Sequence, residues 1–438
     1  MKKLVYLFLF GIIFTSQAQD YWTGLNGPFG GTINDIVSPS AGVMLASTAN
    51  GVYRSTNSGA SWSRMALGSD NSFSDLEIDP SSGGNKIFAA TNNGARVYVS
   101  SDAGVTWTQL VATGITLAVT KIKVASTGTT IYMTDTGLRV LKSTNSGADF
   151  STLQTFSGTT ITDLDLDNLN NVYVSTNGQG IKVSNGIAAF TTPSTGSLTG
   201  SSIVYSTVIK SSTEIFCLSS NGAHKSTNAG GVYALISTGL TDPSYSGIID
   251  VDAGGNIFVC NNNVGPQKIY TSTAASAGAS WSFVSAPFWS LSVTASYFES
   301  LASFYVGLGN IGVVKATSNG TSWANSTTGI KSIQTSNKIF ISPQNNYLFV
   351  SGTGLGYYSS LNNGATWNYN ANGATNRNIV GFVKLSDNSI LGYGSGGVIR
   401  SDNDESFWFQ QSTQILNELV TSDGVNLFSY SGTSILTH

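Results

Sequence analysis

Short runs of alternating apolar and polar residues recur along the whole chain, separated by polar turns. Residues 161–190 show the pattern clearly. Alternation over Ile161 to Asp167 predicts a strand, and further short strands follow at Val172 to Ser175 and at Ile181 to Val183. The two preceding repeats have the same order. The pattern therefore predicts a repeated unit of antiparallel strands.

Each unit ends in an eight-residue motif with Ser first, Asn or Asp third, Gly fifth and an aromatic last. The best copies contain Ser55, Asn57, Gly59 and Trp62; Ser100, Asp102, Gly104 and Trp107; Ser143, Asn145, Gly147 and Phe150; and Ser360, Asn362, Gly364 and Trp367. Weaker copies end at Phe190, Tyr233, Trp281, Trp323 and Trp408. Consecutive closing aromatics lie 40 to 48 residues apart. A period of about 40–45 residues suits a four-stranded propeller blade, and Gly, Asn, Ser and Thr are too frequent for two-helix repeats.

Elementary chemistry explains the motif as a turn between the third and fourth strands. An Asn or Asp side chain at the third position can bond backbone groups two residues on. Glycine at the fifth position accepts a positive φ. The aromatic then enters the next strand and packs inward. We therefore expect every copy of the motif to be structural.

The motif resembles the Asp-box, or BNR repeat, and the resemblance covers nearly all of residues 19–438. Asp-box β-propellers include sialidases, xyloglucanase-type glycosidases, sortilin-type receptors and photosystem II stability-factor-like proteins. The resemblance implies an all-β propeller. It does not imply one activity, because unrelated activities share this fold.

The two ends of the chain predict how the propeller closes. Three strands follow Trp408, the last at Ser434 to Thr437, while Tyr21 to Leu25 resembles an unpaired fourth strand. Joining them completes a blade and removes the sheet edges. With nine internal repeats, this predicts a single ring of about ten four-stranded blades. Two smaller rings, or a chain that lacks a C-terminal extension, are the alternatives.

Composition indicates an exported protein. Residues 1–18 have the basic start, apolar run and small-residue exit of a signal peptide. Charged residues are 10% of the chain and the net charge is −3. We therefore expect no nucleic-acid partner and no transmembrane segment. The expected location is extracellular, cell-surface or periplasmic, and the expected state is a monomer.

The two cysteines, Cys217 and Cys260, fall in second strands of consecutive repeats, one residue out of register. That offset places them on opposite sheet faces, so they could meet between neighbouring blades or point apart. Export permits a disulfide. Two buried free thiols are the favoured interpretation.

Candidate catalytic acids lie on the innermost strands. Asp35, Asp75, Asp163 and Glu418 are in phase, as is Lys121, and in a ten-bladed ring Glu418, Asp35 and Asp75 would occupy consecutive blades. Glycoside hydrolysis needs two carboxyls about 5–9.5 Å apart. The competing interpretation, which we favour, is that each acid bonds water or a neighbouring backbone.

Catalytic signatures of the resembling enzymes are poorly met. There is no Arg-Ile-Pro motif of the sialidases, and the xyloglucanase nucleophile would fall near Ala49 or Asn50. The run from Asp163 to Asn168 matches a calcium loop only superficially. His224 and His438 are too few for a metal site. We expect no cofactor and no metal.

Function is therefore predicted only coarsely. The favoured interpretation is a secreted, non-catalytic propeller that binds an extracellular protein or polysaccharide. A divergent glycan-active enzyme, either a glycoside hydrolase or sialidase-like, is one alternative. An assembly protein like the photosystem II stability factors is another, although their arginine-rich surfaces are missing here.

Overall fold

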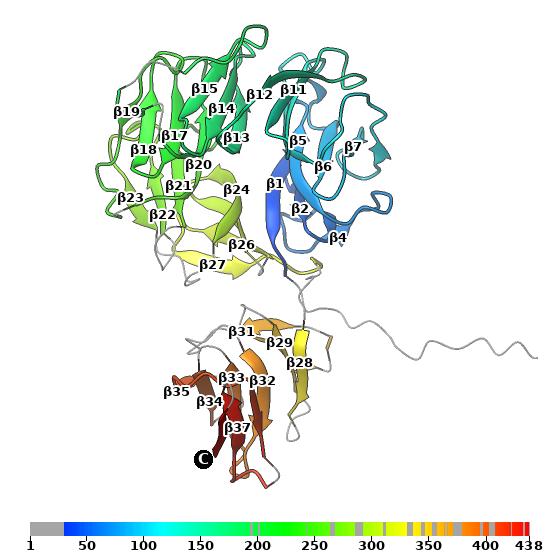
Figure 1. Cartoon of the computed structure of the whole chain (residues 1–438), viewed down its shortest axis with the longest axis vertical. Coiled ribbons are helices and arrows are strands. Elements are labelled where there is room, and N and C mark those ends of the chain that lie inside the picture. The colour runs from blue at the N-terminus through cyan, green and yellow to red at the C-terminus, as the bar shows by residue number, and fades with distance from the viewer. Residues whose placement is uncertain are drawn as a thin grey trace, which may run out of the picture.

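The computed structural model describes residues 30–438, apart from 193–195, 200–201, 243, 263–267, 285–291, 310–311, 331–335, 343–346, 353–356, 363, 366, 371–378, 395–396, 403–407, 422, 432–433 and 438. The described chain is all-β, as predicted, and its strands form ten antiparallel sheets (Figure 1). Within this part, the one helical element is the 3₁₀ turn η1 (Pro80–Ser82). The predicted signal peptide and the predicted closing strand at residues 21–25 lie outside the described residues.

Each sheet follows the chain order from an inner first strand outward. Sheet 1 contains β1 (Ile33–Ser40), β2 (Val43–Thr48), β3 (Gly51–Ser55) and β4 (Ser63–Arg64). Sheet 2 contains β5 (Phe73–Ile78), β6 (Ile87–Thr91), β7 (Val97–Ser100) and β8 (Thr108–Gln109). Sheet 3 contains β9 (Val119–Val124), β10 (Ile131–Asp135), β11 (Arg139–Ser143) and β12 (Ser151–Thr155). Sheet 4 contains β13 (Ile161–Leu166), β14 (Val172–Thr176) and β15 (Ile181–Ser184).

The next three sheets repeat this plan. Sheet 5 contains β16 (Val204–Ile209), β17 (Ile215–Ser219), β18 (Gly222–Ser226) and β19 (Ala234–Leu235). Sheet 6 contains β20 (Gly247–Val251), β21 (Ile257–Asn261), β22 (Lys268–Ser272) and β23 (Ser282–Val284). Sheet 7 contains β24 (Val293–Ser300), β25 (Ser303–Leu308), β26 (Gly312–Thr317) and β27 (Ser322–Asn325).

Three more sheets follow. Sheet 8 contains β28 (Ser336–Ile341), β29 (Leu348–Gly352), β30 (Tyr357–Ser360) and β31 (Asn368–Asn370). Sheet 9 contains β32 (Ile379–Lys384), β33 (Ile390–Gly394), β34 (Gly397–Ser401) and β35 (Phe409–Ser412). Sheet 10 contains β36 (Glu418–Val420), β37 (Phe428–Ser431) and β38 (Ser434–Thr437). Inner strand β32 contacts both β28 and β36.

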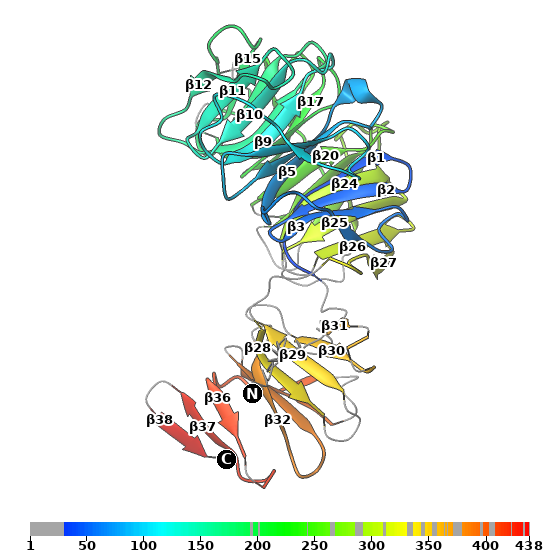
Figure 2. The same ribbon diagram turned by 90° about the vertical axis from the view of Figure 1, so that its right-hand side faces the viewer.

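The first seven sheets form a ring of their own. Each inner strand contacts the inner strand of the next sheet, and β24 of sheet 7 contacts β1 of sheet 1 (Figure 2). At this seam the Trp62 indole N–H donates to the Ser326 carbonyl over 2.6 Å, and the Trp62 amide donates to the Thr328 carbonyl over 2.7 Å. The two sheets also share one apolar cluster.

The predicted single ring of about ten blades is therefore wrong at this seam, because sheet 1 packs on sheet 7 and not on sheet 10. Repeat sequences specify each blade and the way it packs on the next. They do not specify which blade returns to the first. Here the return is made by Trp62 and by residues that follow sheet 7.

The Asp-boxes form tight turns with one hydrogen-bond pattern. In the second copy, the Ser100 hydroxyl accepts from the Gly104 amide over 2.8 Å and donates to the Asp102 carboxylate. The carboxylate accepts from the Thr106 amide over 2.8 Å. The Asn or Asp thus bonds four residues on, not two as expected, while Gly104 has the expected positive φ of 82°.

Replacing Ser100 by alanine should lower the free energy of unfolding by about 1–3 kcal/mol, because the buried Gly104 amide loses its acceptor. Ser101→Ala, at an exposed neighbour, is the matched control and should change it by less than about 0.5 kcal/mol. Urea unfolding followed by circular dichroism measures both. Equal losses would show that the hydroxyl does not hold the turn.

The closing aromatics differ in burial. Trp62, Phe150, Tyr233, Trp281 and Trp408 are buried, whereas Trp107, Phe190, Trp323 and Trp367 are half-buried. The Trp107 indole N–H donates within its own box, to the Gly104 carbonyl over 3.0 Å. Cys217 and Cys260 are both buried and free, which confirms the favoured interpretation of the two thiols.

Candidate functional site

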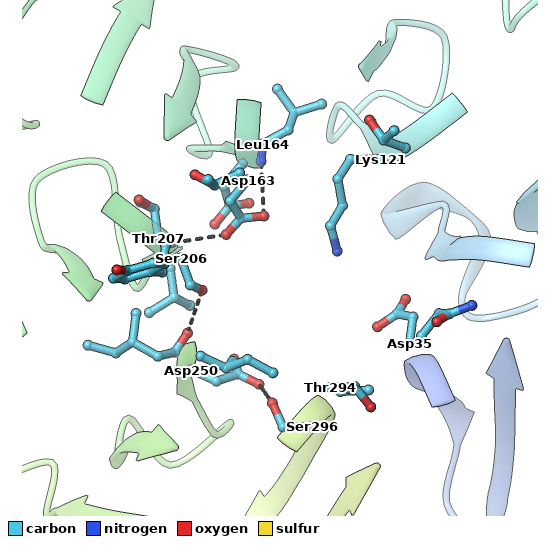
Figure 3. Close-up of a pocket in the computed structure, with 18 of the residues that line it drawn as sticks. Asp35, Lys121, Asp163, Leu164, Ser206, Thr207, Asp250, Thr294 and Ser296 are labelled. Atoms are coloured by element: carbon cyan, nitrogen blue, oxygen red, sulfur yellow. Dashed lines mark hydrogen bonds between the residues drawn. The ribbon is translucent and has the colours of Figure 1, made fainter. Parts of the chain in front are cut away.

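A cavity of about 590 Å³ opens along the axis of the seven-sheet ring. All seven inner strands line it, together with Asn92 from the turn between β6 and β7. The lining is mainly polar: hydroxyls, carboxylates and two ammonium groups. Lys121 projects into the space between Asp35 and Asp163 (Figure 3). Because Asn92 lines it, the cavity reaches the face that carries the second-to-third turns, and we call that end its mouth.

A recurring β-bulge gives this cavity its polar lining. The inner strands contain Ile33-Asn-Asp-Ile36, Phe73-Ser-Asp-Leu76, Val119-Thr-Lys-Ile122 and Ile161-Thr-Asp-Leu164. Pairing with the second strand shifts register within each of these stretches. A regular strand sends successive side chains to opposite faces, and a bulge re-aims one of them. Two consecutive polar side chains can therefore reach the next sheet.

These two side chains form what we call the inter-sheet clamp. The Asn34 amide donates to the Phe73 carbonyl of sheet 2 over 2.6 Å. The Asp35 carboxylate accepts from the Leu76 amide of the same strand over 3.0 Å. Asn34 thus bonds the carbonyl of Phe73, and Asp35 bonds the amide of Leu76, three residues further along the same strand. The clamp fixes the spacing of successive inner strands.

The clamp recurs between sheets 2 and 3. The Ser74 hydroxyl donates to the Val119 carbonyl over 2.6 Å, and the Asp75 carboxylate accepts from the Ile122 amide over 2.7 Å. A second row of inter-sheet hydrogen bonds lies further along β5. There the Glu77 carboxylate accepts from the Val124 amide over 3.3 Å.

Sheets 4 and 5 are joined in the same two rows. The Thr162 hydroxyl donates to the Val204 carbonyl over 2.6 Å, and the Asp163 carboxylate accepts from the Thr207 amide over 2.9 Å. In the second row, the Asp165 carboxylate accepts from the Ile209 amide over 3.1 Å. These carboxylates are bound to neighbouring backbone.

Sheet 3 interrupts the pattern because lysines occupy both acid positions. The Lys121 ammonium lies 3.0 Å from Asp75, and the Lys123 ammonium lies 3.5 Å from Glu77 and 4.0 Å from Asp165. Lysine cannot accept a hydrogen bond from sheet 4. Between sheets 3 and 4 the Lys123–Asp165 pair therefore stands in the second row of the clamp, whereas Lys121 pairs back to Asp75 of sheet 2.

Burial raises the pKa of several carboxyls in and beside the cavity wall. It is the main cause for Asp35, whose pKa is about 6 and which also faces the Asp75 charge. Burial likewise raises the pKa of Glu77 to about 7, that of Asp165 to about 6 and that of Asp250 to about 7. The facing carboxylates raise the pKa values of Lys121 and Lys123. Both lysines are therefore charged at neutral pH.

These raised values predict that the fold loses stability as pH rises from about 4 to 7. A carboxyl with a higher pKa in the folded than in the unfolded state stabilises the fold fully only below its unfolded pKa. We expect the melting temperature to be lower at pH 8 than at pH 5. In the Asp250→Asn variant this side chain cannot ionise, so the difference in melting temperature between pH 5 and pH 8 should be smaller. An unchanged pH dependence in this variant would contradict the assignment for Asp250.

The three acids predicted as candidates do not come together. Asp35 and Asp75 occupy consecutive sheets of the ring and face the same lysine. Glu418 begins β36 of sheet 10. This strand pairs with β37 and contacts β32 of sheet 9. The predicted three-acid arc depended on sheet 10 lying beside sheet 1. That part of the prediction is wrong, for the reason given above.

Ion pairs near the turns of this face were missed from the sequence. Asp70, in the connection from β4 to β5, accepts from Arg96 over 2.7 Å and from the Tyr98 hydroxyl over 2.8 Å. The Arg96 hydrogen bond holds the Asp70 pKa below its usual range. Asp242, in the connection from β19 to β20, pairs in the same way with Lys268 and Tyr270. The sequence signal that could have identified these ion pairs is a basic residue two positions before a tyrosine at the start of the third strand.

His224 is buried between two serines. Its Nδ1 lies 2.9 Å from the Ser197 hydroxyl and its Nε2 lies 2.8 Å from the Ser219 hydroxyl. Burial lowers its pKa to about 4, so the ring is neutral at physiological pH. Among the described residues, no three His, Cys, Asp or Glu side chains are grouped to hold a metal ion.

Basic residues before the boxes have a structural use. Arg54 donates to the Ala103 carbonyl in the box of the next sheet over 2.9 Å. Lys142 makes the equivalent bond to the Gly186 carbonyl over 2.7 Å. These side chains join successive boxes on the face opposite the cavity mouth and are not available as a substrate clamp.

The position expected for a xyloglucanase nucleophile lies in the turn between β2 and β3. Ala49 and Asn50 lie there, and neither carries a carboxylate. The Asn50 backbone N–H donates to the Thr48 hydroxyl over 2.8 Å, and its backbone carbonyl accepts from Arg64 over 2.7 Å. A carboxamide is not a glycosidase nucleophile. Separately, no helix in the described part of the chain is long and apolar enough to cross a membrane.

Comparison with known proteins supports the propeller. No protein-family profile matches the chain. A xyloglucanase from Hypocrea jecorina (strain QM6a) is 32% identical over 105 residues, which are 23% of this chain and 12% of that protein. The matched part is therefore a small share of the relative's length.

Solved structures agree on the architecture. An ancestral GH74 enzyme superposes with a TM-score of 0.69 at 14% identity, covering 95% of this chain and 68% of that one. A GH74 xyloglucanase from Xanthomonas campestris superposes with a TM-score of 0.57 at 13% identity, covering 94% of this chain and 80% of that one. YCF48 bound to a D1 peptide superposes with a TM-score of 0.51 at 13% identity, covering 66% of this chain and 93% of that one. The expected resemblance to Asp-box propellers is confirmed, and at these identities it concerns the fold alone.

Proposed function

We propose that the protein is an exported, non-catalytic β-propeller that binds the end of a glycan at the mouth of the seven-sheet ring. The observation that carries the non-catalytic part is the clamp. Asp75 and Asp163 use their carboxylates to hold the next sheet, and Asp35 uses one oxygen in the same way. General acid–base catalysis needs carboxyls that reach a substrate proton.

The cavity lining favours a glycan over a protein segment. Its volume of about 590 Å³ suits a group of one or two sugar rings rather than a folded surface. Hydroxyls of Thr162, Ser206 and Thr294, the ammonium of Lys121 and the carboxylate of Asp163 all line it. The ammonium can donate to sugar hydroxyls, and the hydroxyl and carboxylate oxygens can accept from them. Tyr205 adds an aromatic ring to the wall.

A divergent glycan-active enzyme is the second candidate, and one observation favours it. Asp35 has a pKa of about 6, and its neighbour Asp75 is paired with Lys121. A carboxyl with a raised pKa beside a second carboxyl is the combination that glycoside hydrolysis uses. We rank it second because both carboxylates bind the next inner strand. For an assembly role like that of the photosystem II stability factors, we find no favouring site among the described residues.

Affinity electrophoresis of the intact protein tests binding. Gels containing xyloglucan, mixed-linkage β-glucan or sialylated glycoprotein should retard the protein in at least one case. Tyr205→Ala should remove the retardation, whereas Val105→Ala, an exposed change on the box side, should not. No retardation in any gel, or retardation that Tyr205→Ala leaves unchanged, would overturn the assignment of a glycan to this mouth.

A further inference from the structure

One register position, set by pairing with the second strand, can be followed around all seven inner strands of the ring. From sheet 1 to sheet 7 it holds Asp35, Asp75, Lys121, Asp163, Ser206, Ile248 and Ala295. All of these residues except Asp75 line the cavity. At this position the side chain is therefore charged in sheets 1 to 4 and uncharged in sheets 5 to 7.

The uncharged half of the cavity has further apolar groups. Val208 lines it at the register position that Asp165 occupies in sheet 4. Tyr205 contributes an aromatic ring. We call Tyr205, Val208, Ile248 and Ala295 the apolar wall. It faces the charged half, because Lys121 and Asp35 lie across the cavity from sheet 5 (Figure 3).

The hydroxyl groups beside the apolar wall are already directed at protein oxygens. They donate over 3.3 to 3.4 Å, from Ser206 to Ile249, from Thr294 to Gly307 and from Ser296 to Asp250. Their oxygens remain as acceptors. In the charged half, by contrast, the Lys121 ammonium projects into the cavity as a donor (Figure 3). The two halves therefore suit different edges of a ligand.

An ordinary hexose matches only one of these halves. Oxygen atoms surround its ring, so one of them has to face the apolar wall and lose hydrogen bonds to water that carbon atoms cannot replace. A 6-deoxyhexose carries a methyl group in place of the hydroxymethyl group. It therefore presents an apolar group on one edge of the ring and hydroxyls on the others.

We propose that the glycan end bound in this cavity is a 6-deoxyhexose. Its methyl group packs on the apolar wall, and its ring hydroxyls face Asp35, Lys121 and Asp163. The carboxylates accept from the hydroxyls, and the ammonium donates to them. This inference rests on the proposed glycan-binding function and names the class of sugar that the site takes.

Matched sugars test the inference on the intact protein. L-Fucose and L-galactose differ only in the hydroxyl at C6, as do L-rhamnose and L-mannose. Isothermal titration calorimetry with the four methyl glycosides should show at least one 6-deoxy sugar binding about five- to tenfold more tightly than its parent, because a methyl group is buried. Saturation-transfer NMR of that glycoside should give its strongest signal at the C6 methyl protons.

Substitutions in the apolar wall give a second readout. Val208→Thr replaces a methyl group by a hydroxyl with little change in volume, and it should remove most of the preference for the 6-deoxy sugar. Ile248→Thr should act in the same direction. Val105→Thr makes the same replacement at a site on the box side that is 53% exposed, and it should keep the full preference. Circular dichroism checks that all three variants fold.

The outcomes separate this inference from the function on which it rests. Equal affinity for the 6-deoxy sugars and their parents, or a preference that both wall variants leave unchanged, would overturn the inference while retardation in glycan gels still stands. A strongest NMR signal elsewhere on the sugar would contradict the placing of the methyl group. If no gel retards the protein and none of the four glycosides binds, the proposed function fails and this inference fails with it.

Discussion

Replacing Trp62 by alanine should destabilise the seven-sheet ring by about 3–5 kcal/mol, the usual cost of emptying a buried tryptophan site. The indole is 4% exposed and lies in the cluster shared by sheets 1 and 7. Its N–H also donates to the Ser326 carbonyl, which would be left without this donor. The substitution therefore weakens the contact between sheets 1 and 7 that closes the ring.

Trp107→Ala is the matched control for this prediction. Trp107 occupies the same box position, but it is half-buried and bonds within its own box. We expect a smaller loss of about 1–2 kcal/mol. Urea unfolding followed by far-ultraviolet circular dichroism measures both variants, and limited proteolysis should cut Trp62→Ala more rapidly near residues 326–330. Equal losses, with no change in proteolysis, would show that Trp62 does not close the ring.

Replacing Asp75 by alanine is expected to cost about 2–4 kcal/mol. Its buried carboxylate accepts from the Ile122 amide over 2.7 Å and pairs with Lys121 at 3.0 Å. Removing one partner of a buried ion pair leaves the other uncompensated. The estimate is at the lower end of the range for such pairs because the Lys121 side chain keeps 33% of its surface exposed.

Two further variants separate the charge from the hydrogen bond. Asp75→Asn keeps an acceptor for the Ile122 amide and should lose about half as much stability. Adding Lys121→Met to Asp75→Ala should recover part of the loss, because no unpaired ammonium remains. If Asp75→Ala unfolded at the same urea concentration as the wild type, the clamp would not hold sheets 2 and 3 together.

The sequence predicted the local architecture well because each repeat carries its own instructions. Alternation predicted a strand at residues 161–167, and β13 spans Ile161–Leu166. The positive φ of Gly104 followed from its place in the turn. The number of blades in the ring did not follow, because the seam between Trp62 and Ser326 joins residues 264 positions apart. No repeat marks such a pairing.

The candidate site was predicted in part. Asp35 and Lys121 were in phase and do line one cavity, and Asp75, also in phase, pairs with Lys121 beside it. The clamp was not predicted, because it depends on a bulge that sends Asn34 and Asp35 to the same neighbour, and strict alternation would place them on opposite faces. Glu418 was grouped with these acids only through the assumed ring size.

The most direct test of the account is a turnover assay with the intact protein on xyloglucan, β-glucans and sialosides, with reducing ends and released sialic acid as readouts. The account predicts no product above the level of a heat-denatured control, because the cavity carboxylates are held by backbone amides. Product formation by the wild type that Asp35→Asn or Asp75→Asn abolishes, while the variant stays folded at the assay temperature by circular dichroism, would contradict it and identify a glycan-active enzyme.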